Sequence, residues 1–330
     1  MTRFLVTGAA GFIGSHFVRE LLAGHYELEA SEVTVLDKLT YAGNLENLAG
    51  VSADPRYRFV QGDICDAGLL DSLLPGHDVV VNFAAETHVD RSIHGPQDFI
   101  ITNVVGAQTL FDACLRHDVP RTVHIGTDEV YGSIDVGSWN EDEPLRPNSP
   151  YSAAKASAEL LVRAYHVTYG LNISSTRCSN NYGPYQFPEK VIPLFVTNLI
   201  DGEQVPLYGD GLNVRDWLHV DDHCRGIALV VQVGEPGQSY NIGGGLELNN
   251  RELTERVLAA MGADWSSVRP VEDRKGHDRR YSVDDSRLRA LGYQPQHGFD
   301  DGLAETIAWY RGNEAWWRPL KERAVIAKTR

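Results

Sequence analysis

A glycine-rich turn between an apolar strand and a helix constrains the fold of this chain more than any other feature. Phe4–Val6 is predicted to be a strand, and the run Thr7-Gly8-Ala9-Ala10-Gly11-Phe12-Ile13-Gly14 follows it directly. Ile13, Phe17 and Leu21 then recur at the spacing of one helix face. Glycines permit a sharp turn and a close approach to an anion, and a helix N-terminus offers it free N–H groups. The spacing is G-x-x-G-x-x-G rather than the standard G-x-G-x-x-G, so the motif needs support from the rest of the chain.

Short β-branched runs alternate with helical stretches along the first half of the chain. Further strands are predicted at 33–36, 57–60, 79–83, 122–125 and 172–176, and helices are predicted at 97–117 and 151–169. Such alternation favours an α/β fold with a Rossmann-type doubly wound parallel sheet. Beyond about residue 177, Pro and Gly become frequent and the alternation stops, which indicates a smaller, irregular lobe.

Two domains are therefore expected. Residues 1–177 form the dinucleotide-binding domain, and residues 178–330 form mainly the substrate-binding lobe. Ser239–Ile242 has the character of a strand that returns to the main sheet, so the segment near 225–245 is assigned to the first domain.

Composition excludes several classes of partner. The formal net charge of −15 opposes binding to nucleic acid. No apolar run approaches the ~20 residues that span a bilayer, so no membrane segment is expected. Cys65, Cys114, Cys178 and Cys224 are widely spaced without a C-x-x-C, which favours reduced thiols over disulfides or zinc. The glycine motif begins at Gly8 and leaves no room for a signal peptide, so a cytoplasmic location is expected.

Asp37 supports a dinucleotide at the glycine turn. It follows the second predicted strand, where a carboxylate can accept hydrogen bonds from the adenosine ribose diol. A 2′-phosphate would instead meet a like charge. We therefore expect NAD rather than NADP, although the adjacent Lys38 weakens this preference.

Tyr151 and Lys155 indicate redox chemistry on an alcohol. They are four residues apart and share one face of a predicted helix. A phenol with its usual pKa of about 10 is a poor base, but a nearby ammonium favours the phenolate. Lys155 and a cationic nicotinamide ring are together expected to lower the pKa of Tyr151. Thr127 ends the fifth predicted strand, at the edge of the sheet where ligands bind, and can share a substrate oxygen with Tyr151.

Several longer segments carry a resemblance to a known family. They are Ala84–Ser92, Thr127–Gly132, Ser149–Ala156, Asn180–Pro184, Arg215–His223 and Asp273–Asp278. With the glycine turn, they make the chain similar to the extended short-chain dehydrogenase/reductases. Within that superfamily it resembles the nucleotide-sugar 4,6-dehydratases along nearly its whole length, above all those that act on dTDP-glucose. Thr87 replaces the usual Ser, and His219 stands where Tyr is frequent.

The resemblance implies a hydro-lyase that uses NAD and a nucleoside-diphosphate sugar. Asp128 and Glu129 distinguish a dehydratase from other members of the superfamily, because loss of water needs an additional acid and base. By resemblance, Asp128 is the acid and Glu129 the base. The catalytic set is thus Thr127, Asp128, Glu129, Tyr151 and Lys155.

The remaining expected contacts fall into two groups. The cofactor residues are Gly8, Gly11, Phe12, Ile13, Gly14, Asp37, Lys38, Thr40, Asp63, Ile64, Phe83, Ala84, Ala85, Thr102, Tyr151, Lys155 and Asn181. The substrate residues are Thr87, Thr127, Asn180, Lys190, Val191, Pro206, Tyr208, Arg215, Asn250, Arg274 and His277.

Other interpretations stay open at this stage. A nucleotide-sugar 4-epimerase or decarboxylase would share the Thr–Tyr–Lys set, and a non-catalytic NAD-binding regulator would share the fold. His219-x-x-x-His223 with Asp221 and Asp222 suggests a metal site, but none is expected, because the reaction needs no Lewis acid. The helix at 97–117 has an unusually wide apolar face, which indicates either burial on two sides or assembly into a homodimer.

Overall fold

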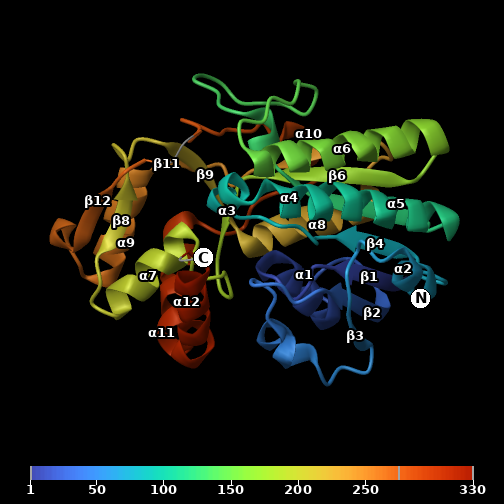
Figure 1. The fold of residues 1–330 in the computed structure, drawn as a ribbon, viewed down its shortest axis with the longest axis horizontal. Helices are drawn as coiled ribbons and strands as arrows, with labels where there is room; N and C mark the ends of the chain where they lie inside the picture. Colours follow the sequence, from blue (N-terminus) through green and yellow to red (C-terminus); the bar gives the residue numbers. More distant parts are fainter. Residues whose placement is uncertain (1, 274–275, 329–330) are drawn as a thin grey trace.

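The computed structural model describes residues 2–273 and 276–328, and its main body is a parallel sheet flanked by helices (Figure 1). The seven strands lie in the order β10-β6-β5-β4-β1-β2-β3, and each neighbouring pair is parallel. The strands are β1 (Thr2–Thr7), β2 (Ala30–Asp37), β3 (Tyr57–Gln61), β4 (Val79–Asn82), β5 (Arg121–Thr127), β6 (Ile173–Cys178) and β10 (Ser239–Ile242). The predicted fold class is confirmed, and β10 lies at one edge of this sheet beside β6.

Side chains of β1 point alternately to two hydrophobic cores, one on each face of the sheet. Phe4 and Val6 pack with residues of α1 and α8, whereas Leu5 packs with residues of α2, α5 and α6. The helices are α1 (Phe12–Ala23), α2 (Ala67–Leu73), α5 (Ala107–Arg116), α6 (Pro150–Tyr169) and α8 (Val220–Val233). Burial on both faces explains why the strands are nearly continuous apolar runs.

The second lobe contains two small sheets, with strand orders β11-β9-β7 and β12-β8, packed against helices around a separate core. Its strands are β7 (Asn180–Tyr182), β8 (Val205–Tyr208), β9 (Val214–His219), β11 (Glu247–Asn249) and β12 (Val268–Val271). Its helices are α7 (Val191–Ile200), α9 (Asn250–Met261), α11 (Phe299–Gly312) and α12 (Glu314–Lys328), and α10 (Ser286–Ala290) lies against β10. Short connecting helices are η1 (Leu45–Val51), α3 (Val89–His94), η3 (Asp128–Tyr131) and η4 (Trp265–Ser267).

The helix predicted at 97–117 contains a wider turn in its middle. It consists of α4 (Pro96–Ile100), a π-helical segment η2 (Ile101–Gly106) and α5. Gly106 permits close packing here, because an added Cβ would lie 2.8 Å from the Ile64 side chain. The amide of Asn103 bonds both backbone groups of Glu86, at 2.8 and 3.0 Å. The π segment thereby fixes the chain that follows β4.

Two further expectations concern the chain as a whole. Within residues 2–273 and 276–328, no helix combines the length and apolar character needed to cross a bilayer. All four cysteines are free thiols.

Candidate active site

The glycine turn sits where β1 ends, between the ends of β2 and β4. Gly8 has φ +67°, and an added Cβ would lie 2.5 Å from the backbone nitrogen of Ala84. A Cβ on Gly14 would lie 2.8 Å from the Cα of Ala9. Helix α1 begins after Gly11 without a side-chain cap, so the donors of its first turn are available to a ligand. Gly8 and Gly14 thus permit tight packing of the turn, and the free N–H groups at the start of α1 fit the diphosphate of a dinucleotide.

Asp37 ends β2 and is almost fully buried beside the turn. Its two oxygens accept from the backbone nitrogens of Ala10 and Leu39, at 2.9 and 2.8 Å. Each carboxylate oxygen can accept a further bond, so the side chain remains able to bind a diol. Lys38 pairs with Asp63 at 2.7 Å, which directs its ammonium away from Asp37. The arrangement favours a ribose diol over a 2′-phosphate more clearly than the sequence suggests.

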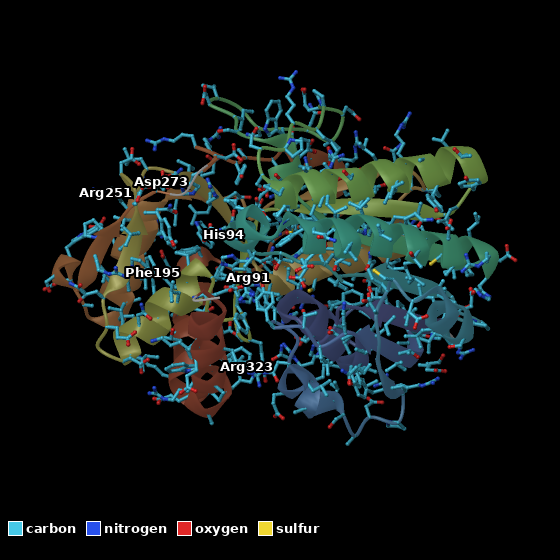
Figure 2. All side chains as sticks on the ribbon, in the orientation of Figure 1. Arg91, His94, Phe195, Arg251, Asp273 and Arg323 are labelled. Atoms are coloured by element: carbon cyan, nitrogen blue, oxygen red, sulfur yellow. The ribbon has the colours of Figure 1, made fainter. Side chains whose placement is uncertain are left out.

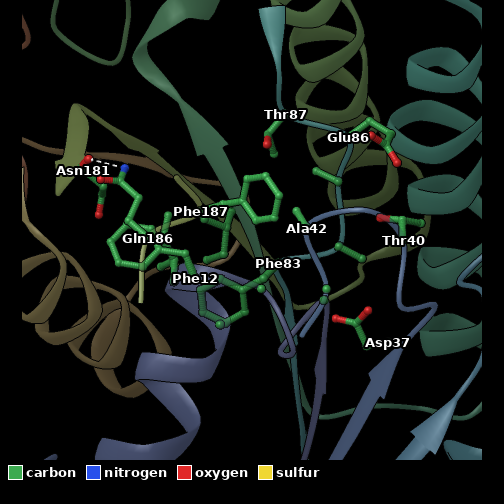
Figure 3. Close-up of a pocket in the computed structure, with 18 of the residues that line it drawn as sticks. Phe12, Asp37, Thr40, Ala42, Phe83, Glu86, Thr87, Asn181, Gln186 and Phe187 are labelled. Carbon is green, nitrogen blue, oxygen red and sulfur yellow. Dashed lines mark hydrogen bonds between the residues drawn. The ribbon is translucent and has the colours of Figure 1, made fainter. Parts of the chain in front are cut away.

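A cavity of about 300 Å³ runs along the carboxyl ends of the strands and continues toward the second lobe. Every predicted catalytic residue and every predicted cofactor residue lines it, and so do the predicted substrate residues Thr87, Asn180 and Lys190. Figure 3 shows its length, with Asp37 at the end of β2 and Asn181 and Gln186 on the far side. The structure therefore joins residues from the whole length of the sheet into one site.

At the end of β5, Thr127 caps the short helix η3 by accepting from the backbone nitrogen of Glu129 at 3.4 Å. This turn places Asp128 in the interior, with 3% of its surface exposed. Burial, followed by the charges of Glu129 and Asp216, raises the pKa of Asp128 well above its usual value. Its Oδ2 atom is buried without a hydrogen-bond partner among the described residues. Burial therefore favours the protonated form of Asp128, which lines the cavity.

Helix α6 places Tyr151 and Lys155 across from η3. Ser149 and Ser152 cap the helix reciprocally, with both hydrogen bonds at 3.0 Å, so Tyr151 lies in its first turn. Lys155 lies one turn later and donates from Nζ to the carbonyl oxygen of Ile125 at 2.5 Å. Burial lowers the pKa of Lys155 to about 8.

The expected lowering of the Tyr151 pKa does not arise from the protein alone. Burial and the charge of Glu129 raise the pKa of Tyr151 well above 10, while a hydrogen bond with Thr127 opposes this. Desolvation penalises a phenolate whose neighbours include an acidic group. Tyr151 therefore needs an additional positive charge before it can act as a base.

The other predicted substrate residues that the structure describes lie outside the lining of this cavity. Val191 begins α7, Tyr208 ends β8, and Asn250 begins α9. Pro206 lines a second hollow of about 200 Å³, which it shares with Glu189. Arg274 falls outside the described residues.

Two of these predicted residues already have partners within the second lobe. Arg215 stacks on Tyr281 at 4.3 Å and donates to the carbonyl oxygen of Asp278 at 3.0 Å. His277 pairs with Asp273 at 2.7 Å; Figure 2 labels Asp273 in this lobe, near Arg251. Their roles remain predictions.

Sequence reasoning missed several residues that line the cavity. Tyr41 lies in the loop after β2, Phe187 and Glu189 follow β7, and Trp316 and Leu320 belong to α12. The only signal for Glu189 in the sequence is its position directly before Lys190, which is predicted to bind the substrate. No local pattern marks Trp316 or Leu320, because their role depends on where α12 docks.

The acidic pair at the start of α8 lies with His297 in an arrangement that has metal-ligand spacing. Asp221 is already paired with His16 at 3.1 Å and Arg225 at 2.7 Å. Asp222 accepts from the backbone nitrogens of Gln296 and His297. These contacts account for both carboxylates as structural groups.

Together, the parallel sheet, the glycine turn and the buried Thr–Tyr–Lys set define an extended short-chain dehydrogenase/reductase. Over residues 5–306 the chain matches the protein family described as GDP-mannose 4,6 dehydratase. It is 62% identical over 322 residues to a dTDP-glucose 4,6-dehydratase from Streptomyces antibioticus, with 97% of this chain and 95% of that protein covered. A dTDP-glucose 4,6-dehydratase from Actinoplanes sp. is 60% identical over 318 residues, with 96% and 99% covered.

Solved structures agree with these relatives. A crystal structure of dTDP-glucose 4,6-dehydratase from Streptomyces venezuelae, with NAD and TYD bound, matches with a TM-score of 0.96. The two chains are 65% identical, and 97% of this chain and 100% of that chain are covered. The chain belongs to the family of dTDP-glucose 4,6-dehydratases.

Proposed function

We propose that this protein is an NAD-dependent hydro-lyase that converts dTDP-glucose to the 4-keto-6-deoxy sugar nucleotide with loss of water. The observation that carries the proposal is Asp128, a buried carboxyl whose pKa is raised, placed beside Glu129 and within the same cavity as Tyr151. The reaction of a 4-epimerase or of a decarboxylase does not require this additional acid. A non-catalytic protein would have no reason to keep Tyr151 and Lys155 buried in the cavity.

The two parts of the molecule divide the binding between them in this proposal. The turn from Gly8 to Gly14 and the carboxylate of Asp37 hold the dinucleotide on the main sheet. Asn180 and Lys190 of the second lobe, together with Thr87 from the segment that follows β4, hold the sugar nucleotide. Lys190 Nζ lies 3.4 Å from the carbonyl oxygen of Thr87, so the cation that we assign to the diphosphate stands next to the residue that we assign to the sugar.

Proton transfers by three side chains account for the reaction. Tyr151 removes the proton from the 4-hydroxyl, while Thr127 orients that oxygen. Glu129 removes the proton from carbon 5, which a ketone at carbon 4 acidifies. Asp128 gives its proton to the 6-hydroxyl, which leaves as water. When bound, NAD⁺ would supply a hydride acceptor for carbon 4, a hydride donor for carbon 6 and the positive charge that stabilises the Tyr151 phenolate. Glu129 returns its proton to carbon 5 as carbon 6 is reduced, which completes the 4-keto-6-deoxy product.

We further propose that the protein is a homodimer of the cytoplasm. The wide apolar face of 97–117 is divided between two environments: Phe99 and Phe111 are buried, whereas Ile101 and Val105 are 41% and 48% exposed. The adjoining helix α6 adds Leu160 and Val167, which are 60% and 66% exposed. Apolar side chains at this density on two neighbouring helices support burial against a second copy.

The four free thiols support the proposed cytoplasmic location, because they suit a reducing compartment.

A product assay tests the proposed activity. The purified protein is incubated with dTDP-glucose, UDP-glucose, GDP-mannose or CDP-glucose, and the products are identified by NMR. We expect dTDP-glucose to give a 4-ketone and a methyl group at carbon 6, with the other three turned over more slowly. A product that keeps its 6-hydroxyl and is inverted at carbon 4 would instead identify an epimerase.

A further inference from the structure

A group of side chains that no step of the proposed reaction uses connects the loop 38–44 to the second lobe. Tyr41 lies in this loop and lines the cavity. Its hydroxyl donates to Oε1 of Glu189 at 3.0 Å. Glu189 belongs to the segment between β7 and α7, so the bond joins the end of the main sheet to the other part of the molecule across the cavity.

Arg91 ties a third element to this pair. Its guanidinium lies 3.6 Å from the centroid of the Tyr41 ring, and its Nη2 atom lies 3.6 Å from Oε2 of Glu189. Nε2 of His88 lies 3.7 Å from the same oxygen. Arg91 is labelled in Figure 2 at the boundary between the main sheet and the second lobe. Because the Glu189 side chain is only 2% exposed, these contacts stabilise a carboxylate that water barely reaches.

Apolar contacts reinforce the polar ones on the side of α12. Tyr41 and Ala42 pack against Phe187 and Leu320, with Trp316 beside them. The rings of Tyr41 and Phe187 meet edge to face with centroids 5.6 Å apart. Figure 3 shows Ala42 and Phe187 close together at the cavity. The loop is therefore held closed by a hydrogen bond, a cation–π contact and a small apolar cluster.

The loop is also fixed at its base by the residue that we assign to the adenosine ribose. Asp37 accepts from the backbone nitrogen of Leu39, whose φ of +58° is unusual for a residue with a side chain. Burial and the charge of Glu189 raise the pKa of Tyr41, so its hydroxyl keeps the proton that it donates. A loop held at both ends can cover a ligand that is bound between them.

We propose that Tyr41, Arg91 and Glu189 form a clasp that retains the bound dinucleotide from one turnover to the next. The inference rests on the proposed function, because a reaction that regenerates NAD⁺ in each cycle gains nothing by releasing it. Release requires the Tyr41–Glu189 bond to break and the loop to separate from Phe187 and Leu320. Tyr41 and Glu189 act as positioning residues, with no direct part in the chemistry.

Tyr41→Phe is the most selective test, because it keeps the ring that packs on Arg91 and removes only the hydroxyl. The protein is loaded with radiolabelled NAD⁺, desalted, and chased with unlabelled NAD⁺ while the bound label is followed. A lost hydrogen bond to a charged group corresponds to release about 10-fold faster than in the wild type. Tyr240→Phe is the matched control, since its hydroxyl accepts from the backbone nitrogen of Glu235 at 2.8 Å, away from the cavity lining.

Glu189→Gln provides a second variant, which removes the charge that faces Arg91. It should also release label faster, and the effects of the two changes in the double variant with Tyr41→Phe should be less than additive, because both weaken the same Tyr41–Glu189 interaction. Release at the wild-type rate from both single variants would overturn the clasp, as would equal acceleration by Tyr240→Phe. The NMR product assay on the wild type separates this result from a failure of the proposed function, because label release does not depend on turnover.

Discussion

Nδ1 of His223 lies 2.9 Å from Oδ1 of Asn181, and this contact fixes the orientation of a residue in the cavity. The Asn181 amide nitrogen donates to the carbonyl oxygen of Ser179 at 2.9 Å, so Oδ1 must accept and His223 must carry its proton on Nδ1. Burial lowers the pKa of His223 to about 3. The H-x-x-x-H pattern is thus explained by a neutral histidine that positions Asn181.

Acid stability tests this protonation state. Because the pKa of His223 falls from about 6.5 in the unfolded chain to about 3 in the fold, the unfolded state binds more protons between these values. Stability is therefore full above pH 6.5 and is lost as the pH falls toward 3. His223→Asn keeps a donor but does not titrate, so it should lose about 2 kcal/mol less than the wild type between pH 7.5 and pH 5. Urea unfolding at both pH values measures this, and equal losses would contradict a buried neutral ring.

Coenzyme choice depends on Asp37. Asp37→Asn removes the negative charge but keeps the shape, so NAD⁺ should bind about 10-fold more weakly, because charge-assisted bonds to its ribose are lost. The repulsion of a 2′-phosphate is removed as well, so the preference over NADP⁺ should decrease. Calorimetric titration with both coenzymes measures this. Lys38→Met serves as the control: it should change the preference little, because that ammonium is paired with Asp63.

The separate roles of Asp128 and Glu129 can be distinguished by isotope exchange. Asp128→Asn removes the acid, so loss of water should slow at least about 100-fold, while deuterium from D₂O still enters carbon 5 of recovered substrate. Glu129→Gln removes the base, so both water loss and exchange should stop. NMR of substrate recovered from D₂O reports both processes. Exchange in the Glu129→Gln variant at the wild-type rate would show that another group removes the carbon 5 proton.

Assembly can be tested by charging the exposed apolar face. Val105→Asp combined with Leu160→Asp should yield a monomer in sedimentation velocity, because burying two carboxylates against a partner costs several kcal/mol. Val136→Asp is the control, because Val136 is 88% exposed in a loop outside this face. A double variant that sediments like the wild type would place the interface elsewhere or make the protein a monomer.

Local pattern predicts the main sheet well, because each strand and its following helix are contiguous in sequence. The glycine turn, Asp37 and Thr127 lie at the ends of regular elements, and Tyr151 and Lys155 lie in the first two turns of α6, so local pattern is enough to predict their positions on these elements. The carboxyl ends of parallel strands then meet at one edge without further information.

The parts that could not be predicted depend on contacts between distant segments. Tyr41 and Leu320 meet because α12 docks beside the loop 38–44, and Tyr41 meets Glu189 because the segment after β7 lies across the cavity from that loop. The π segment at 101–106 ends at Gly106, which packs closely against Ile64, and no periodicity indicates either feature. Lys155 and a cationic nicotinamide ring were together expected to lower the pKa of Tyr151. The degree of burial, which a sequence does not reveal, raises this pKa in the protein alone.

Transfer of deuterium within a single sugar tests the central claim most directly. dTDP-glucose labelled with deuterium at carbon 4 is incubated with the protein in ordinary water, without added coenzyme, and the product is examined by NMR and mass spectrometry. Conversion by Tyr151, Asp128 and Glu129 predicts a 4-keto-6-deoxy product whose deuterium has moved to the methyl group at carbon 6. A product with deuterium still at carbon 4, or with the label lost to water, would contradict the proposed reaction.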